Sequence, residues 1–136
     1  MKNEWTSGPN LKQTRAYHSC LYDHKTRSVF VIGGVSENEL GSEILKSTEK
    51  LNIQQKQLWE QTTDLPAPLF RSAAIASNSI DFVGYIAGGD VNIAGATQGK
   101  TDKVWGLRQA DMKWEEMRTR LQIPREAHTM VNVGSC

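Results

Sequence analysis

An internal repeat of 54 to 56 residues is the feature that most constrains the fold of this chain. Three kinds of landmark recur at this spacing: Trp5, Trp59 and Trp114, the pairs Gly33-Gly34 and Gly88-Gly89, and Arg15, Arg71 and Arg125. A shared period of this length is typical of repeat architectures, in which each unit completes its core only against its neighbours. The spacing therefore predicts two whole units, 15–70 and 71–124. Residues 1–14 are expected to end a preceding unit and residues 125–136 to begin a truncated one.

The hydrophobic pattern inside each unit predicts strands. Apolar residues alternate or form short solid runs, and no window of eleven residues keeps helical spacing. In the first unit the expected strands are 18–22, 29–32, 48–53 and 58–59, with a long polar loop at 36–46. In the second they are 72–77, 84–87, 104–107 and 113–114, with a loop at 90–101. The fold class is therefore all-β.

Four short antiparallel strands, repeated at this period, match one blade of a β-propeller. Known propellers close a ring of about four to eight blades. Two blades cannot close one, so we expect the remaining blades to come from a longer parent chain or from homo-oligomerisation.

The motifs resemble a kelch repeat. The first copy is Arg15-x-x-His18, Val29-Phe30-Val31-Ile32-Gly33-Gly34, Glu49-Lys50-Leu51-Asn52 and Leu58-Trp59-Glu60. The second is Arg71, Tyr85-Ile86-Ala87-Gly88-Gly89, Asp102-Lys103-Val104 and Trp114-Glu115-Glu116, and Pro124-Arg125-x-x-His128 opens a third. Ala74 departs from the pattern, because it stands where the other copies have histidine. The resemblance implies a partial kelch-type propeller with four-stranded antiparallel blades.

Each recurring residue has an expected structural role. The double glycines allow positive φ and close backbone approach where the chain leaves a buried strand. Each tryptophan is expected to fill the wide outer gap between blades. The arginine before each innermost strand is expected to bind loop carbonyls or a carboxylate of the adjacent blade.

Composition and charge exclude several classes of protein. The chain has 16 Lys and Arg against 15 Asp and Glu, which gives a net charge of +1 and no basic stripe for nucleic acid. Its longest aliphatic and aromatic run, Val29 to Ile32, is far shorter than the ~20 residues that cross a membrane. Two cysteines, Cys20 and Cys136, are expected to be free, mostly buried thiols in a reducing compartment, which favours the cytoplasm.

The sequence offers weak candidates for chemistry. Residues 94–101 end in Gly99-Lys100-Thr101, like a P-loop, but the first glycine of that pattern is Ala94 and a strand follows. His18, Cys20 and His24 lack a fourth metal donor. No Gly-x-Ser-x-Gly elbow occurs. We therefore expect no catalytic residue, no cofactor and no metal.

Loops on a rigid scaffold carry recognition residues, and the kelch resemblance implies that both rims of the propeller can hold peptides. The long loops 35–46 and 90–101 are expected on one rim and the short segments around Arg15 and Arg71 on the other. The candidate partner-binding residues are Tyr17, Glu39, Glu43, Asp90 and Asn92. The predicted function is protein binding, in a larger adaptor for ubiquitin ligases or a cytoskeletal scaffold. One alternative is a fragment of a kelch-propeller enzyme acting on sugars, similar to galactose oxidase or sialic-acid isomerase. Another is a structural tile that assembles with itself.

Overall fold

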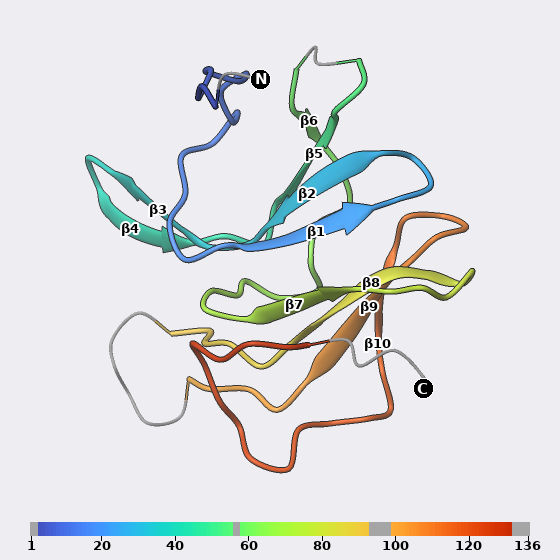
Figure 1. Cartoon of the computed structure of the whole chain (residues 1–136). Helices are drawn as coiled ribbons and strands as arrows, with labels where there is room; N and C mark the ends of the chain where they lie inside the picture. Colours follow the sequence, from blue (N-terminus) through green and yellow to red (C-terminus); the bar gives the residue numbers. More distant parts are fainter. Residues whose placement is uncertain (1–2, 56–57, 93–98, 132–136) are drawn as a thin grey trace.

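A computed structural model describes residues 3–55, 58–92 and 99–131, and these form an all-β structure (Figure 1). One four-stranded antiparallel sheet has the order β1-β2-β5-β6, a second has β7-β8-β9-β10, and β3 pairs with β4. The strands are β1 Ser19–Asp23, β2 Ser28–Ile32, β3 Val35–Asn38, β4 Gly41–Ile44, β5 Thr48–Asn52, β6 Glu60–Gln61, β7 Ala73–Ala76, β8 Phe82–Ala87, β9 Val104–Arg108 and β10 Trp114–Glu116. The prediction of an all-β fold is confirmed.

The two larger sheets have the same internal plan. In each, the strand that ends at the double glycine is central and pairs with one neighbour on either side: β2 with β1 and β5, and β8 with β7 and β9. A central strand buried on both faces reads as a solid apolar run, which is why 29–32 was recognisable in the sequence.

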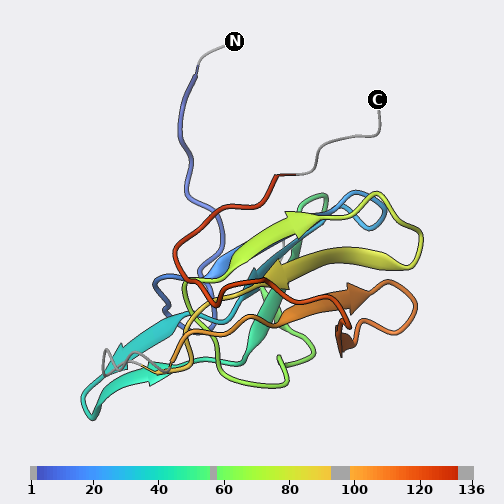
Figure 2. The same ribbon diagram turned by 90° about the horizontal axis from the view of Figure 1, so that it is seen from below.

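The two sheets stack face to face and share one core, with β1 packed against β7 and β8 (Figures 1 and 2). Its buried side chains come from both sheets and from the segment between β6 and β7: Leu21, Phe30, Ile32, Leu65, Leu69, Val83, Ile86, Trp105 and Leu107. Gly84 makes room for Leu21, because a Cβ at residue 84 would lie 2.8 Å from Leu21 Cδ2. At this one contact a small residue of the second unit therefore accommodates a large side chain of the first.

The double glycines repeat one connection between successive units. Gly34 donates its N–H to the Leu69 carbonyl at 2.9 Å, and Gly89 donates to that of Arg125 at 2.8 Å. Gly33 and Gly88 both have φ of 62°. A Cβ at Gly33 would overlap the carbonyl oxygen of Leu69, and a Cβ at Gly88 would overlap that of Arg125. Both the backbone angle and the close approach therefore require glycine here.

Two tryptophans also link successive units. Trp59 donates its indole N–H to the Pro9 carbonyl at 3.0 Å, and Trp114 donates to that of Thr63 at 3.2 Å. Pro9 follows Trp5 by four residues, and Thr63 follows Trp59 by four. Each indole thus reaches the matching place in the preceding unit. Trp5 itself is fully exposed and lies outside any strand.

Replacing Trp114 by Phe should remove this link while keeping an aromatic ring. We expect a loss of about 0.5–1.5 kcal/mol in the free energy of unfolding, the usual net value of one hydrogen bond. Urea denaturation followed by circular dichroism measures it. Trp5→Phe is the matched control and should change nothing, because the Trp5 side chain is fully exposed. Equal losses in both variants would contradict the proposed role of the indole.

The structure corrects the register of the recurring arginines. Tyr17, Arg71 and Ala127 all have positive φ near 50–55°, and Arg71 N–H bonds the Tyr17 carbonyl as Ala127 N–H bonds that of Arg71. Arg71 therefore occupies the place of Tyr17, and Leu69 that of Arg15. Ser72, not Ala74, stands in register with His18 and His128. The sequence alignment of the three arginines was wrong because backbone hydrogen bonds set the register between units. These are the bonds of Gly34 and Gly89, and they do not depend on which side chain the partner residue carries.

The predicted loop at 36–46 was wrong, since β3 and β4 form a hairpin there. The tight turn is set by Asn38, whose Oδ1 accepts the Leu40 N–H at 2.9 Å, and by Gly41, whose φ is 125°. The hairpin projects from the sheets in both views (Figures 1 and 2), and most of its side chains are exposed, so no continuous buried face imposes an apolar alternation.

Two smaller predictions also need correction. The fourth strand of the first unit is Glu60–Gln61 and not 58–59, although β10 does include Trp114. Cys20 is exposed and not buried, because it points to the outer face of β1 while Leu21 points into the core. Cys136 lies outside the described residues.

Candidate functional site

The segments just before β1 and β7 contain Ala16 and Phe70, and we call them the lead-in segments. They lie at the same end of the sheets as the long loops, and we call this end the hairpin end. Ala16 pairs with Val35, and Phe70 pairs with Asp90, each in an antiparallel bridge. The expectation that these segments open on opposite rims was therefore wrong. The reason is that the segment before each inner strand pairs directly with the residue that follows each double glycine.

A hollow of about 230 Å³ opens at the hairpin end, between the first unit and the second. We call it the rim hollow. Its lining residues are Tyr17, Val35, Glu37, Ser42, Phe70, Arg71, Asp90, Asn92 and Glu126. Three of the five predicted contact residues, Tyr17, Asp90 and Asn92, are thus brought together.

The hairpin contributes different residues from those predicted. Glu37 pairs with Ser42 and both line the rim hollow, whereas Glu43 pairs with Ser36 and Glu39 lies in the turn. Because side chains alternate between the faces of a strand, Glu37 and Glu43 point to opposite sides. If the hairpin had been predicted, its register would have put Glu37 on the face that lines the rim hollow. Glu37 was missed because the turn was not recognised.

Arg71 is the central side chain of the rim hollow. Its guanidinium carbon lies 4.8 Å from the centre of the Tyr17 ring and 5.4 Å from that of Phe70. Its Nη1 lies 3.3 Å from Glu126, whose hydrogen bond raises the pKa of Arg71 above its usual range. Arg71 was predicted as a structural landmark on a rim segment and not as a contact residue, because the register that places it beside Tyr17 is tertiary.

Asp90 anchors the far wall of the rim hollow. The residue is buried, and its Oδ1 accepts the Asn92 N–H at 2.8 Å. Val91 N–H bonds the Gly99 carbonyl at 3.0 Å, and a Cβ at Gly99 would overlap Asp90 Oδ1. Asp90, Val91 and Gly99 are therefore held together.

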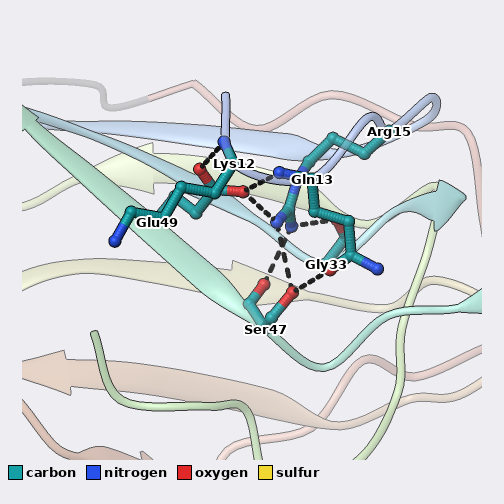
Figure 3. Close-up of polar contacts among 6 residues, drawn as sticks. All are labelled: Lys12, Gln13, Arg15, Gly33, Ser47 and Glu49. Carbon is teal, nitrogen blue, oxygen red and sulfur yellow. Dashed lines mark hydrogen bonds and ion pairs between the residues drawn. The ribbon is translucent and has the colours of Figure 1, made fainter. Parts of the chain in front are cut away.

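A buried ion pair lies next to Gly33, where β2 ends (Figure 3). Arg15 donates to the carbonyls of Gly33 at 2.8 Å and Ser47 at 2.9 Å and to Glu49 Oε1 at 2.7 Å. Glu49 also accepts the backbone N–H groups of Lys12 and Gln13. The arginine thus binds loop carbonyls, but its carboxylate partner belongs to its own unit and not to an adjacent blade.

A second hollow, of about 370 Å³, lies at the opposite end between the turns of the two sheets. Its buried carboxylate, Asp23, accepts hydrogen bonds from Thr26, Lys25 and Gln109. Burial opposes ionisation of Asp23, but these donors outweigh it and lower its pKa. Since the in-chain donors already use this carboxylate, we place the candidate site at the rim hollow.

The weak chemical candidates gain no support from the described residues. Among residues 3–55, 58–92 and 99–131, no group of three His, Cys, Asp or Glu side chains is placed to hold a metal ion. Most of the P-loop-like segment, 93–98, lies outside the described residues. Lys100 forms a β-bridge with Asp90, and the next element is β9. Within the same described ranges, no helix has the length and apolarity needed to cross a bilayer.

His128 should make stability depend on pH. Both of its ring nitrogens are buried without a hydrogen-bond partner among the described residues. Burial, and then the charge of Arg125, lowers its pKa below the usual value of 6.5. The unfolded chain therefore binds more protons just below pH 6.5, and the free energy of unfolding should fall as the pH drops from 6.5 toward the folded pKa.

Urea denaturation between about pH 5 and 7.5 tests this dependence, with His128→Leu expected to reduce its slope. His18, whose pKa burial also lowers, should supply the remaining slope. His24→Leu is the control, because His24 is exposed in the turn after β1. An unchanged slope in His128→Leu would contradict the assignment.

No protein-family model matches the chain, and no curated protein matches its sequence.

Proposed function

We propose that this chain is part of a kelch-type β-propeller and binds other proteins at the rim hollow. The repeated connection between units supports the propeller. Gly34 to Leu69 and Gly89 to Arg125 are the same bond one period apart, and the two indole links repeat in the same way. Stacked units related by one recurring step are the arrangement that a propeller needs.

The rim hollow carries the functional part of the proposal. It presents Tyr17, which is 60% exposed, beside the guanidinium of Arg71. Residues of both units line the hollow. Tyrosine and arginine are enriched where proteins recognise one another, because they combine apolar area with directed hydrogen bonds. Since in-chain contacts fix both walls, little conformational entropy is lost on binding.

This function is binding and not catalysis, in a reducing compartment such as the cytoplasm. The proposed parent is an adaptor for ubiquitin ligases or a cytoskeletal scaffold, with the remaining blades supplied by that chain or by further copies.

Selection of random peptides displayed on phage against this chain tests the proposal. We expect the recovered peptides to lose at least about tenfold in affinity on Tyr17→Ala, the loss of one central contact of roughly 1.4 kcal/mol. The control is Ile80→Ala, because Ile80 is 79% exposed at the opposite end. Peptides that bind both variants equally well would exclude the rim hollow as the binding site.

A further inference from the structure

Two cations share the carboxylate of Glu126, which lines the rim hollow together with Arg71. Arg71 Nη1 lies 3.3 Å from Glu126 Oε2, and Lys100 Nζ lies 3.5 Å from Oε1. Both distances exceed the ~2.7–2.9 Å of a well-formed charge-assisted hydrogen bond, which Arg15 and Glu49 do achieve at 2.7 Å. The side chains of Arg71 and Lys100 are 39% and 45% exposed. Glu126 is therefore held loosely between two accessible positive groups.

The guanidinium of Arg71 is positioned before any ligand arrives. The rings of Tyr17 and Phe70 lie next to it, and such contacts fix the guanidinium while its edge stays open to hydrogen bonding. A carboxylate matches this edge geometrically, because it can accept two parallel N–H bonds.

The repeat itself does not require a carboxylate at residue 126. Glu126 precedes Ala127, so its counterparts in the register of positive φ are Ala16 and Phe70. Neither counterpart carries a charge, although each makes a backbone bridge to the residue after its double glycine. The charge of Glu126 therefore serves the rim hollow and not the backbone connection.

We infer that the rim hollow takes an acidic side chain of a partner protein, and that Glu126 occupies the place of that carboxylate in the free chain. This inference rests on the proposed function, since it names the partner chemistry of the same site. The ligand carboxylate displaces Glu126 from Arg71 and Lys100.

Two acidic residues on the opposite side of the rim hollow limit the negative charge that a ligand can carry. Glu37 lines the same hollow from the hairpin, and Asp90 lies buried beside it. A second carboxylate on the partner would meet these like charges. The partner segment therefore carries a single acidic residue, flanked by neutral or basic ones.

The experiment titrates the chain with the acetylated, amidated pentapeptide Gly-Ser-Glu-Ser-Gly and, separately, with its Gln counterpart. The side-chain N–H signals of arginine in nuclear magnetic resonance report binding. We expect the Glu peptide to shift the Arg71 signal and to bind at least about tenfold tighter than the Gln peptide, as a charge-assisted contact predicts.

Two variants should move the affinity for the Glu peptide in opposite directions. Arg71→Gln removes the binding group and should weaken binding about tenfold, whereas Glu126→Gln removes the competing carboxylate and should strengthen it about threefold. Arg108→Gln is the matched control, because Arg108 is 42% exposed and pairs with Asp111 in the turn after β9. It should leave the affinity unchanged.

Two results would overturn the inference. If Glu126→Gln weakens binding as Arg71→Gln does, Glu126 is not a competitor. If the Glu and Gln peptides bind equally, the hollow does not select a carboxylate. In either case protein binding at the rim hollow still stands when the phage-selected peptides depend on Tyr17, so the two failures are distinguishable.

Discussion

Glu49→Gln should lower the free energy of unfolding by about 3–5 kcal/mol, the usual cost of removing one partner from a buried ion pair. The side chains of Arg15 and Glu49 are 0% and 2% exposed, so neither water nor another anion can replace the lost charge. The variant keeps the size of the side chain but leaves the Arg15 charge buried without a counter-ion. Urea denaturation followed by tryptophan fluorescence measures the loss.

A second ion pair in the same chain provides the control. Arg71 and Glu126 have side chains that are 39% and 20% exposed, and exposed pairs contribute about 0–1 kcal/mol. Glu126→Gln should therefore be nearly neutral for stability. Similar losses in the two variants would show that burial does not set the strength of the Arg15–Glu49 pair.

Gly33→Ala should be the second strongly destabilising change, with a loss of about 3 kcal/mol or more. Residue 33 has φ of 62°, which costs a residue with a side chain roughly 1–2 kcal/mol. In addition, the new Cβ would overlap the Leu69 carbonyl oxygen, and that carbonyl accepts the Gly34 N–H that joins the two units. Thermal unfolding followed by circular dichroism measures the effect.

Two other glycines separate the angle from the overlap. Gly41 has φ of 125°, but no atom lies within 4 Å of the point where a Cβ would stand, so Gly41→Ala should show the backbone cost alone, about 1–3 kcal/mol. Gly8→Ala meets neither condition and should be neutral. If Gly33→Ala lowers the free energy of unfolding no more than Gly41→Ala does, the connection between units can shift to relieve the overlap at little energetic cost.

Sequence patterns were sufficient where one local requirement determines the residue. The double glycines mark the places in the two units where a central strand ends against the next lead-in segment at positive φ. The solid run 29–32 predicted a central strand because both faces of that strand are covered. Each feature leaves its mark in adjacent residues of the sequence, so both can be predicted without the fold.

The rim hollow was only partly predictable. Tyr17, Asp90 and Asn92 were among the predicted contact residues, but Glu37, Arg71 and Glu126 were not. Glu37 depended on the missed hairpin. Arg71 and Glu126 lie 55 residues apart and meet only because each lead-in segment bonds the one before it.

The sequence by itself determined the period, the all-β class and the double glycines, because a backbone angle or a strand face selects for residue type locally. Only the tertiary structure decided the register of Arg71 with Tyr17, the partner of Arg15 and the end of the sheets at which the loops gather. Backbone hydrogen bonds between units fix these features, and a backbone N–H or carbonyl is the same in nearly every residue. Such bonds leave little trace in side-chain identity, so the sequence pattern could not reveal them.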